Sequence, residues 1–438
     1  MKNPRLSMPL MSAIAALPLV MVAPAVTAPP ASATQEAFYS YTGAAPLASF
    51  EPGTVLATRN LAYRISGIEA PVEVVQLLYR TTDAQYRPSV DVTSVLLPPV
   101  GGDPGKAVAY QSYYDSLNPE DSPSRSIAGQ VSFGGTVFTS ETGTIAALLA
   151  QGYTVIVADT EGQRADFAAG PEYGMTTLDS IRAATRSSAT RLSAATRIGL
   201  AGYSGGALAT NWAAALAPGY APEINARLIG AAEGGVLVNP ARNLGYVDGS
   251  VSWAGIAVMA IIGIGRSYDL DFTPYLSDYG RQLVADLDDA SIGNVLFQHP
   301  GLTWRQLVKT EYADPNTVAP LTSVADRINL GTAPTPTIPM FIGQGANGEL
   351  EGTPGDKPGI GPGDGVMVAG DVRTLARQYC DTGNRAVEYR QYDTLAHGTA
   401  QAEWTPQALA WLNDRFAGTA APTSCGAIAP GNLLTTRL

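Results

Sequence analysis

Charged residues are scarce in this 438-residue chain. Asp, Glu, Lys and Arg together make up 15% of it, whereas 45% of the residues are hydrophobic. So little charge beside so much apolar material excludes a mainly disordered protein. Basic residues are the rarer sign, 27 against 38 acidic residues, and the formal net charge at pH 7 is −11. Because an acidic surface repels a phosphate backbone, nucleic acid is not an expected partner.

Cysteine is nearly absent, with Cys380 and Cys425 as the only two. Two cysteines in an exported protein are expected to pair, whereas in a cytosolic protein they would more often remain buried thiols. The choice between a disulfide and two thiols therefore depends on whether the chain is exported.

Residues 1–33 have the layout of a secretory signal peptide. Lys2 and Arg5 precede an apolar segment that ends in small residues at Ala33. A membrane anchor is the alternative reading, but two prolines interrupt the apolar run and make it a poor spanning helix. Cleavage after Ala33, or earlier after Ala28, would leave a secreted protein; the first site gives 25 basic and 38 acidic residues, a formal charge of −13. We therefore predict secretion and a Cys380–Cys425 disulfide.

The rest of the chain shows strand-like apolar runs that alternate with helical segments. After an irregular arm expected at 34–70, the runs at 72–82 and 88–99 are separated by little more than turn residues, which predicts an antiparallel pair. The later alternation of strands and helices predicts a mostly parallel sheet with helices on both faces, an α/β fold. No internal repeat is evident.

This alternation stops between residues 236 and 333. Nearly a hundred residues cannot be a bare loop in a compact domain, so we predict a helical cap or lid inserted between two parts of the core, 34–235 and 334–438. The insertion contains the uncharged run WAGIAVMAIIGIG (253–265), which at about a dozen residues is too short to cross a bilayer. Two readings stay open for this run: a core helix packed on the sheet, or a helix that lines a substrate pocket and shields the site.

One serine stands in a pattern that a nucleophile requires. Gly202-Tyr203-Ser204-Gly205-Gly206 matches G-x-S-x-G and follows a strand-like run, and an alanine-rich helical segment comes directly after it. This strand-turn-helix arrangement is typical of the nucleophile elbow, which exposes a serine oxygen above the carboxyl edge of a sheet. A glycine-rich turn with an incidental serine is the alternative.

A serine hydroxyl needs a base, and the chain has only two histidines. His299 precedes a proline inside the predicted cap, where a structural or surface role is expected. His397 lies in a predicted loop between the last strand-like run and the last helix, which is where a doubly wound hydrolase presents its histidine. If Ser204 is activated, His397 is the expected base.

The acid that orients the histidine should follow the penultimate strand, and the candidates downstream of it are Glu349, Asp356, Asp364 and Asp371. Asp371 is expected on a helix facing solvent, and Asp356 in a flexible loop. Glu349 is nearest the strand, but Asp364 begins a short apolar stretch that leads straight into a helix. We favour Asp364, with Glu349 as the second choice.

The order Ser204, Asp364, His397 is that of the α/β-hydrolase fold. With these motifs the chain resembles the secretory lipases, the fungal lipase A type with its bacterial relatives, over most of its mature length. The resemblance is carried by TSVLLPP, SYYDS, VADTEG, GYSGG, the helical insertion, and the sixteen residues that separate Asp364 from Cys380. It implies a helical lid over an acyl-binding pocket and hydrolysis of fatty esters. It also supports Asp364 over Glu349.

The oxyanion hole of such enzymes needs two backbone N–H donors. Gly205, directly after the nucleophile, is expected to supply one. In the similar lipases the second donor is the aspartate of the Y-x-D-S stretch, which corresponds to Asp115 in SYYDS. A turn or helix-capping role for Asp115 is the alternative, and is compatible with its N–H still donating.

Two departures from the family pattern stand out. About fifteen Gly/Pro-rich residues separate the strand end at GQG from Asp364, where the family usually places its acid directly, and only one cysteine pair is available. The long segment raises a weaker alternative, a calcium loop formed by Glu349, Asp356 and Asp364, against an ordinary flexible loop.

The sequence thus predicts a secreted serine ester hydrolase, a lipase or carboxylesterase that cleaves acyl esters such as triacylglycerols at an oil–water interface. No cofactor, metal, nucleic acid or membrane span is expected. The alternatives are an acyltransferase with the same triad, an esterase for small soluble esters, a peptidase, and a non-catalytic binding protein on the same scaffold. Fold and triad do not separate the first of these, because only the acyl acceptor differs.

Overall fold

The computed structural model describes residues 37–435. The predicted signal peptide, residues 1–33, lies outside the described residues. Nine strands form one sheet in the order β1-β2-β3-β5-β4-β6-β7-β8-β9. The strands are β1 (Val55–Ile65), β2 (Ile68–Thr82), β3 (Pro88–Leu96), β4 (Lys106–Gln111), β5 (Thr154–Ala158), β6 (Arg197–Tyr203), β7 (Leu228–Gly234), β8 (Met340–Gly345) and β9 (Val387–Tyr392).

The sheet is mostly parallel. Strands β4 to β9 run parallel to one another, whereas β1, β2 and β3 pair antiparallel and β3 joins β5 antiparallel. The predicted antiparallel pair is therefore confirmed as β2 and β3, and the predicted α/β fold is confirmed as well.

The irregular arm predicted at 34–70 is wrong for its second half, because β1 and the start of β2 lie there, whereas residues 37–54 contain two short 3-10 helices and no strand. Strand β1 pairs with β2 from Val55 opposite Tyr79 to Ile65 opposite Ile68. It is an edge strand, and only one of its eleven residues is buried. Polar residues such as Arg59 and Asn60 interrupt its apolar ones, so its sequence lacks the continuous apolar run of the inner strands.

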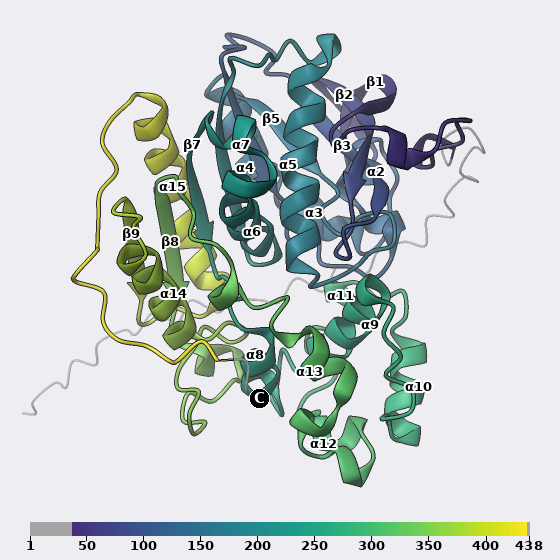
Figure 1. The fold of residues 1–438 in the computed structure, drawn as a ribbon, viewed down its shortest axis with the longest axis vertical. Helices are drawn as coiled ribbons and strands as arrows, with labels where there is room; N and C mark the ends of the chain where they lie inside the picture. The colour runs from purple at the N-terminus through teal and green to yellow at the C-terminus, as the bar shows by residue number, and fades with distance from the viewer. Residues whose placement is uncertain (1–36, 436–438) are drawn as a thin grey trace, which may run out of the picture.

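Helices cover both faces of the sheet (Figure 1). One face packs on α5 (Gly170–Arg186), α6 (Gly205–Tyr220) and α14 (Ala369–Asp381), and the other on α2 (Pro123–Ile127), α3 (Gly135–Ser140), α4 (Thr142–Ala150) and α15 (His397–Phe416). Each face has its own buried apolar cluster, and the two clusters are separated by the sheet itself. Burial on both faces explains the nearly continuous apolar sequences of β4 to β7.

The chain between β7 and β8 folds as a group of helices at one end of the sheet, drawn below it in Figure 1. These are α8 (Pro240–Val247), α9 (Ile256–Tyr268), α10 (Asp278–Asp286), α11 (Ile292–Val295), α12 (Trp304–Leu307) and α13 (Ala319–Ala325). All residues from 236 to 333 are described, and none of them lies in a strand. We refer to residues 236–333 as the helical insertion. Within residues 37–435, every helix is too short or too polar to cross a membrane.

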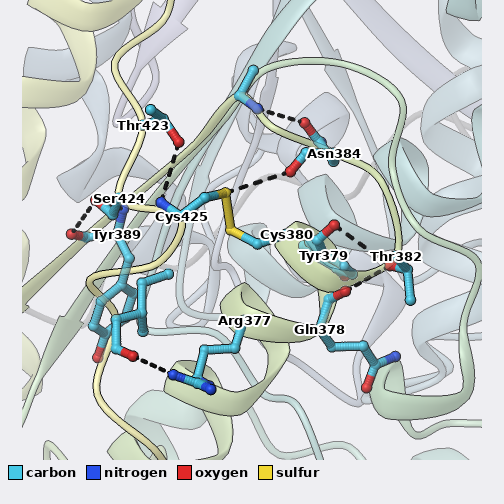
Figure 2. Close-up of a disulfide and its surroundings, with 12 residues drawn as sticks. Arg377, Gln378, Tyr379, Cys380, Thr382, Asn384, Tyr389, Thr423, Ser424 and Cys425 are labelled. Carbon is cyan, nitrogen blue, oxygen red and sulfur yellow. Dashed lines mark hydrogen bonds between the residues drawn. A yellow bond between two sulfur atoms is a disulfide. The ribbon is translucent and has the colours of Figure 1, made fainter.

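The two cysteines form a disulfide, as predicted. Cys380 lies near the end of α14 and Cys425 lies in the segment that follows α15 (Figure 2). Beside the disulfide, that segment is held against β9, because Ser424 N–H donates to the Val387 carbonyl at 2.7 Å and the Ser424 hydroxyl accepts from Tyr389 N–H at 3.0 Å. The disulfide thus fastens the chain that leaves α15 to α14.

Candidate active site

Ser204 is the single residue between β6 and α6. Its φ of 56° lies in the left-handed region, which is strained for a residue with a side chain. The flanking glycines permit the close approach of strand and helix: a Cβ on Gly202 would lie 2.2 Å from the Gly206 carbonyl oxygen, and one on Gly206 would lie 2.1 Å from the Gln111 carbonyl oxygen. The turn therefore tolerates no side chain at either glycine, and it holds Ser204 at the carboxyl end of β6.

His397 and Asp364 form a buried pair near this turn. The Nδ1 atom of His397 lies 2.7 Å from Oδ2 of Asp364, and His397 N–H donates to the Asp364 carbonyl, also at 2.7 Å. The Nε2 atom of His397 is buried and has no hydrogen-bond partner among residues 37–435. One nitrogen of the ring is thus fixed by a carboxylate, and the other is free to accept a proton.

The structure holds Asp364 rigidly. Its Oδ1 atom accepts from Val366 N–H at 3.1 Å and from Met367 N–H at 2.7 Å, while Oδ2 also accepts from the Gln344 amide at 2.9 Å. With His397, four donors converge on one fully buried carboxylate. These hydrogen bonds fix the orientation of the carboxylate that accepts from the histidine ring.

The charges around His397 favour its protonated form. Burial acts to lower the pKa of the imidazole, but the carboxylate of Asp364, followed by those of Glu351 and Asp115, outweighs burial and raises the pKa above 6.5. Tyr203 fixes the residue from the backbone side, because its hydroxyl donates to the His397 carbonyl at 2.7 Å. The prediction of a loop at His397 is off by a few residues, since His397 is the first residue of α15.

Asp115 lies against the elbow on the side of α6. A Cβ on Gly205 would lie 1.9 Å from Oδ1 of Asp115, so the two residues are in direct contact. Within the described chain, the N–H groups of Asp115 and Gly205 donate no hydrogen bond. Burial raises the pKa of the Asp115 carboxyl to about 7, and the nearby His397 acts to lower it. Two free N–H donors beside one serine are what an oxyanion hole requires.

The remaining acid candidates lie elsewhere. Glu349 and Asp356 are exposed. The prediction that Asp371 faces solvent is wrong: it is 1% exposed and pairs with Arg242 of the helical insertion at 2.5 Å. That partner is distant in sequence, which is why the pattern of α14 alone did not indicate it.

The calcium-loop alternative is not supported. Residues 37–435 contain no group of three or more His, Cys, Asp or Glu side chains that could hold a metal ion. The Gly/Pro-rich segment is instead clamped to the insertion, because Lys357 Nζ donates to the carbonyls of Tyr246 and Asp248 at 2.6 and 2.5 Å. His299, the second histidine, is half-buried beside Gly255 in the helical insertion, and burial lowers its pKa.

Two cavities meet at Ser204. The first is lined mainly by apolar side chains and also by Asp115, Ser204 and Gly205. We call it the apolar cavity. Its apolar lining consists of Phe167, Ala168, Leu208, Leu237, Pro240, Leu244, Val247, Ile256, Ala257, Ala260, Val366 and Met367. A cavity with this apolar lining suits the hydrocarbon part of a ligand.

Helix α9 explains the uncharged run of the sequence. Val258, Met259 and Ile262 are buried in the core cluster that contains α5 and α6, whereas Ala257 and Ala260 line the apolar cavity. The two readings of this run, core helix and pocket wall, therefore both describe part of the same helix.

The second cavity also reaches Ser204. Ser204, Asp115 and His397 line it, together with residues of several other elements. We call it the histidine cavity. Glu351 and Trp253 also line it, and no sequence motif marks either as a site residue. The only local signal was that Glu351 follows the penultimate strand, in the segment where the acid was expected.

The chain is similar in sequence and in fold to known lipases. Residues 129–424, more than half of the chain, match the family model described as secretory lipase. Lipase 4 of Candida albicans is 32% identical over 388 residues, which cover 85% of this chain and 80% of that protein. A Mycobacterium tuberculosis protein named as a probable inactive lipase is 31% identical over 377 residues, covering 84% and 79% of the two chains.

Among solved structures, the X-ray structure of Candida antarctica lipase A in its closed state is similar to the whole fold. It aligns with a TM-score of 0.76 and 26% sequence identity over 90% of this chain and 88% of that one.

Proposed function

This chain belongs to the secretory lipase family and is a carboxylic ester hydrolase, and we propose that Ser204, His397 and Asp364 carry out the hydrolysis through an acyl-enzyme. The observation that carries the proposal is the meeting of two cavities at the strained Ser204, one apolar and one containing His397 with a free, buried Nε2. We further propose that the protein is secreted, in keeping with its family and the sequence of residues 1–33.

In the first half-reaction, Ser204 Oγ forms a bond to the ester carbonyl carbon while its proton passes to His397 Nε2. The negative charge that develops on the carbonyl oxygen is stabilised by the N–H groups of Gly205 and Asp115. As this intermediate collapses, the carbon–oxygen bond to the alcohol breaks. The alcohol leaves with the proton from His397, and the acyl group stays on Ser204.

In the second half-reaction, water attacks the acyl-enzyme and gives its proton to His397, which returns it to Ser204 Oγ as the carboxylic acid leaves. Asp364 accepts a hydrogen bond from Nδ1 throughout, so that the free Nε2 faces the reacting groups. The imidazolium formed in each half-reaction is stabilised by Asp364, Glu351 and Asp115, which raise the pKa of His397.

We assign the acyl chain of the substrate to the apolar cavity and the alcohol to the histidine cavity. The apolar lining favours fatty acyl esters, including triacylglycerols, over small polar esters, because each buried methylene contributes about 0.8 kcal/mol. The insertion supplies part of this lining through α8 and α9 and acts as the cap of the site.

Activity of alanine variants tests the assignment. Ser204→Ala and His397→Ala should each lose several orders of magnitude in kcat on p-nitrophenyl esters, because triad residues act as a unit. His299→Ala is the matched control and should keep near-normal kcat. Retained activity in His397→Ala with loss in His299→Ala would overturn the assignment. A series of esters from short to long acyl chains, with water or an added alcohol as acceptor, then separates lipase from short-chain esterase and from acyltransferase.

A further inference from the structure

We propose that Glu351 is a positioning residue for His397 and that it makes the helical insertion part of the support of the catalytic base. The inference rests on the proposed role of His397. Glu351 ends a short 3-10 helix (Gly348–Glu351) after β8, and it is not a member of the triad.

One carboxylate oxygen of Glu351 holds the start of α15. Its Oε1 atom accepts from Gly398 N–H at 2.9 Å, and Gly398 directly follows His397 at the N-terminus of the helix. Backbone N–H groups in this first turn lack a partner within the helix, and a negative charge there is favourable to the helix dipole. Glu351 thus fixes the peptide next to the base.

The other carboxylate oxygen holds the insertion. Oε2 of Glu351 accepts from the Trp253 indole N–H at 2.8 Å, and two further bonds join the same segments. Ser252 Oγ donates to the Glu351 carbonyl at 2.6 Å, and Val251 N–H donates to the Gly352 carbonyl at 3.0 Å. Residues 251–253 are therefore fastened to the segment at Glu351 by three hydrogen bonds.

The same tryptophan contacts the imidazole. The ring of Trp253 meets that of His397 edge-on, with centroids 5.4 Å apart and an interplanar angle of 81°. The ring of Tyr203 packs on His397 at 5.0 Å. Trp253 is 8% exposed, so its indole is largely buried against the site. Displacement of residues 251–253 would remove both the indole contact and one partner of Glu351.

A carboxylate suits this position because both of its partners are donors. A glutamine would offer one acceptor oxygen for two N–H groups and would leave one of them facing its own NH₂. After Asp364, Glu351 is the next carboxylate that raises the pKa of His397. Replacing Glu351 with glutamine therefore perturbs the position of the base and removes one of the charges that favour its protonated form.

The experiment compares three variants of the full protein with wild type in kcat, KM and the pH dependence of kcat/KM. Glu351→Gln should lower kcat by about ten- to a hundredfold with a smaller change in KM, because a displaced base loses the aligned geometry. The acid limb of its pH profile of kcat/KM should move to lower pH, because the imidazole of His397 then deprotonates more easily. Trp253→Phe keeps a ring but loses the donor, and should lower kcat without moving the acid limb. Glu349→Gln, two residues away and exposed, is the matched control and should behave as wild type.

The inference is overturned if Glu351→Gln has the kcat and acid limb of Glu349→Gln, or if its kcat falls while the acid limb stays in place. Normal kcat in Trp253→Phe would overturn the link to the insertion. If Glu351→Gln does not fold, Trp253→Phe still tests that link. Failure of the proposed function is distinct, because it would show as retained activity in His397→Ala.

Discussion

Replacing Asp364 with asparagine changes one atom of the carboxylate and should nearly abolish activity. Both carboxylate oxygens accept two hydrogen bonds: Oδ1 from two backbone N–H groups, and Oδ2 from Gln344 and His397. The asparagine oxygen can keep the backbone bonds, but its NH₂ group then faces the N–H at Nδ1 of His397. Two donors cannot bond to each other.

The ring can relieve this conflict by carrying its proton on Nε2 and accepting at Nδ1. That tautomer cannot take a proton from Ser204, so we expect kcat to fall about ten-thousandfold, or roughly 5.5 kcal/mol of transition-state stabilisation. The fold should survive, because Gln344 has an unpartnered, buried Oε1 that can accept from the new NH₂ group if its amide turns over.

The assay is kcat on a p-nitrophenyl ester, with circular dichroism to confirm folding and Glu349→Gln as the control. Asp364→Asn should be nearly inactive and folded, and Glu349→Gln should be near wild type. An Asp364→Asn variant within about tenfold of wild type would refute the reasoning from the tautomer. If Asp364→Asn stays active and Glu349→Gln loses its activity, the role of the acid belongs to Glu349.

Three further outcomes are expected. Ala260→Phe places a six-carbon ring in the apolar cavity and displaces methylenes of a long acyl chain, each worth about 0.8 kcal/mol when buried. The value of kcat/KM should therefore fall roughly ten- to a hundredfold more for long-chain than for short-chain esters. Ala285→Phe, at an exposed position, should leave chain preference unchanged, and an equal loss for all chain lengths in Ala260→Phe would refute the assignment of the cavity. Reduction of the Cys380–Cys425 disulfide, which closes a loop of 45 residues, should lower the free energy of unfolding by up to about 4 kcal/mol in urea titrations, and an unchanged midpoint would contradict this. Burial raises the pKa of Glu233 to about 8, so between the unfolded pKa near 4.5 and pH 8 the folded state holds a proton that the unfolded state releases. The contribution of this group to the free energy of unfolding should therefore decrease by about 1.4 kcal/mol per pH unit in that window. Glu233→Gln should flatten the decrease, and a pH profile of stability identical to that of wild type would contradict this prediction.

Much of the site could be predicted because its signals are local. The elbow is formed by five consecutive residues, and only glycine allows the close approach of β6 and α6 on either side of Ser204. The scarcity of histidine left one plausible base. Asp364 was indicated by its place before α14, although the sequence alone could not exclude Glu349.

The features that were missed depend on contacts between distant segments. Strand β1 is stabilised by pairing with β2, not by an apolar run of its own. Asp371 is buried because Arg242, more than a hundred residues away, meets it. Trp253 is brought to Glu351 and His397 only when the helical insertion folds against the segment after β8. Hydrogen bonds across such separations leave no periodic pattern in the sequence.

The most direct test of the account is covalent labelling of the full protein with a fluorophosphonate, followed by peptide mapping. The account predicts a single modification at Ser204, with labelling strongly slowed in His397→Ala and unchanged in His299→Ala. An unlabelled protein, or a label on any other residue, would contradict the assignment of Ser204 as the activated nucleophile.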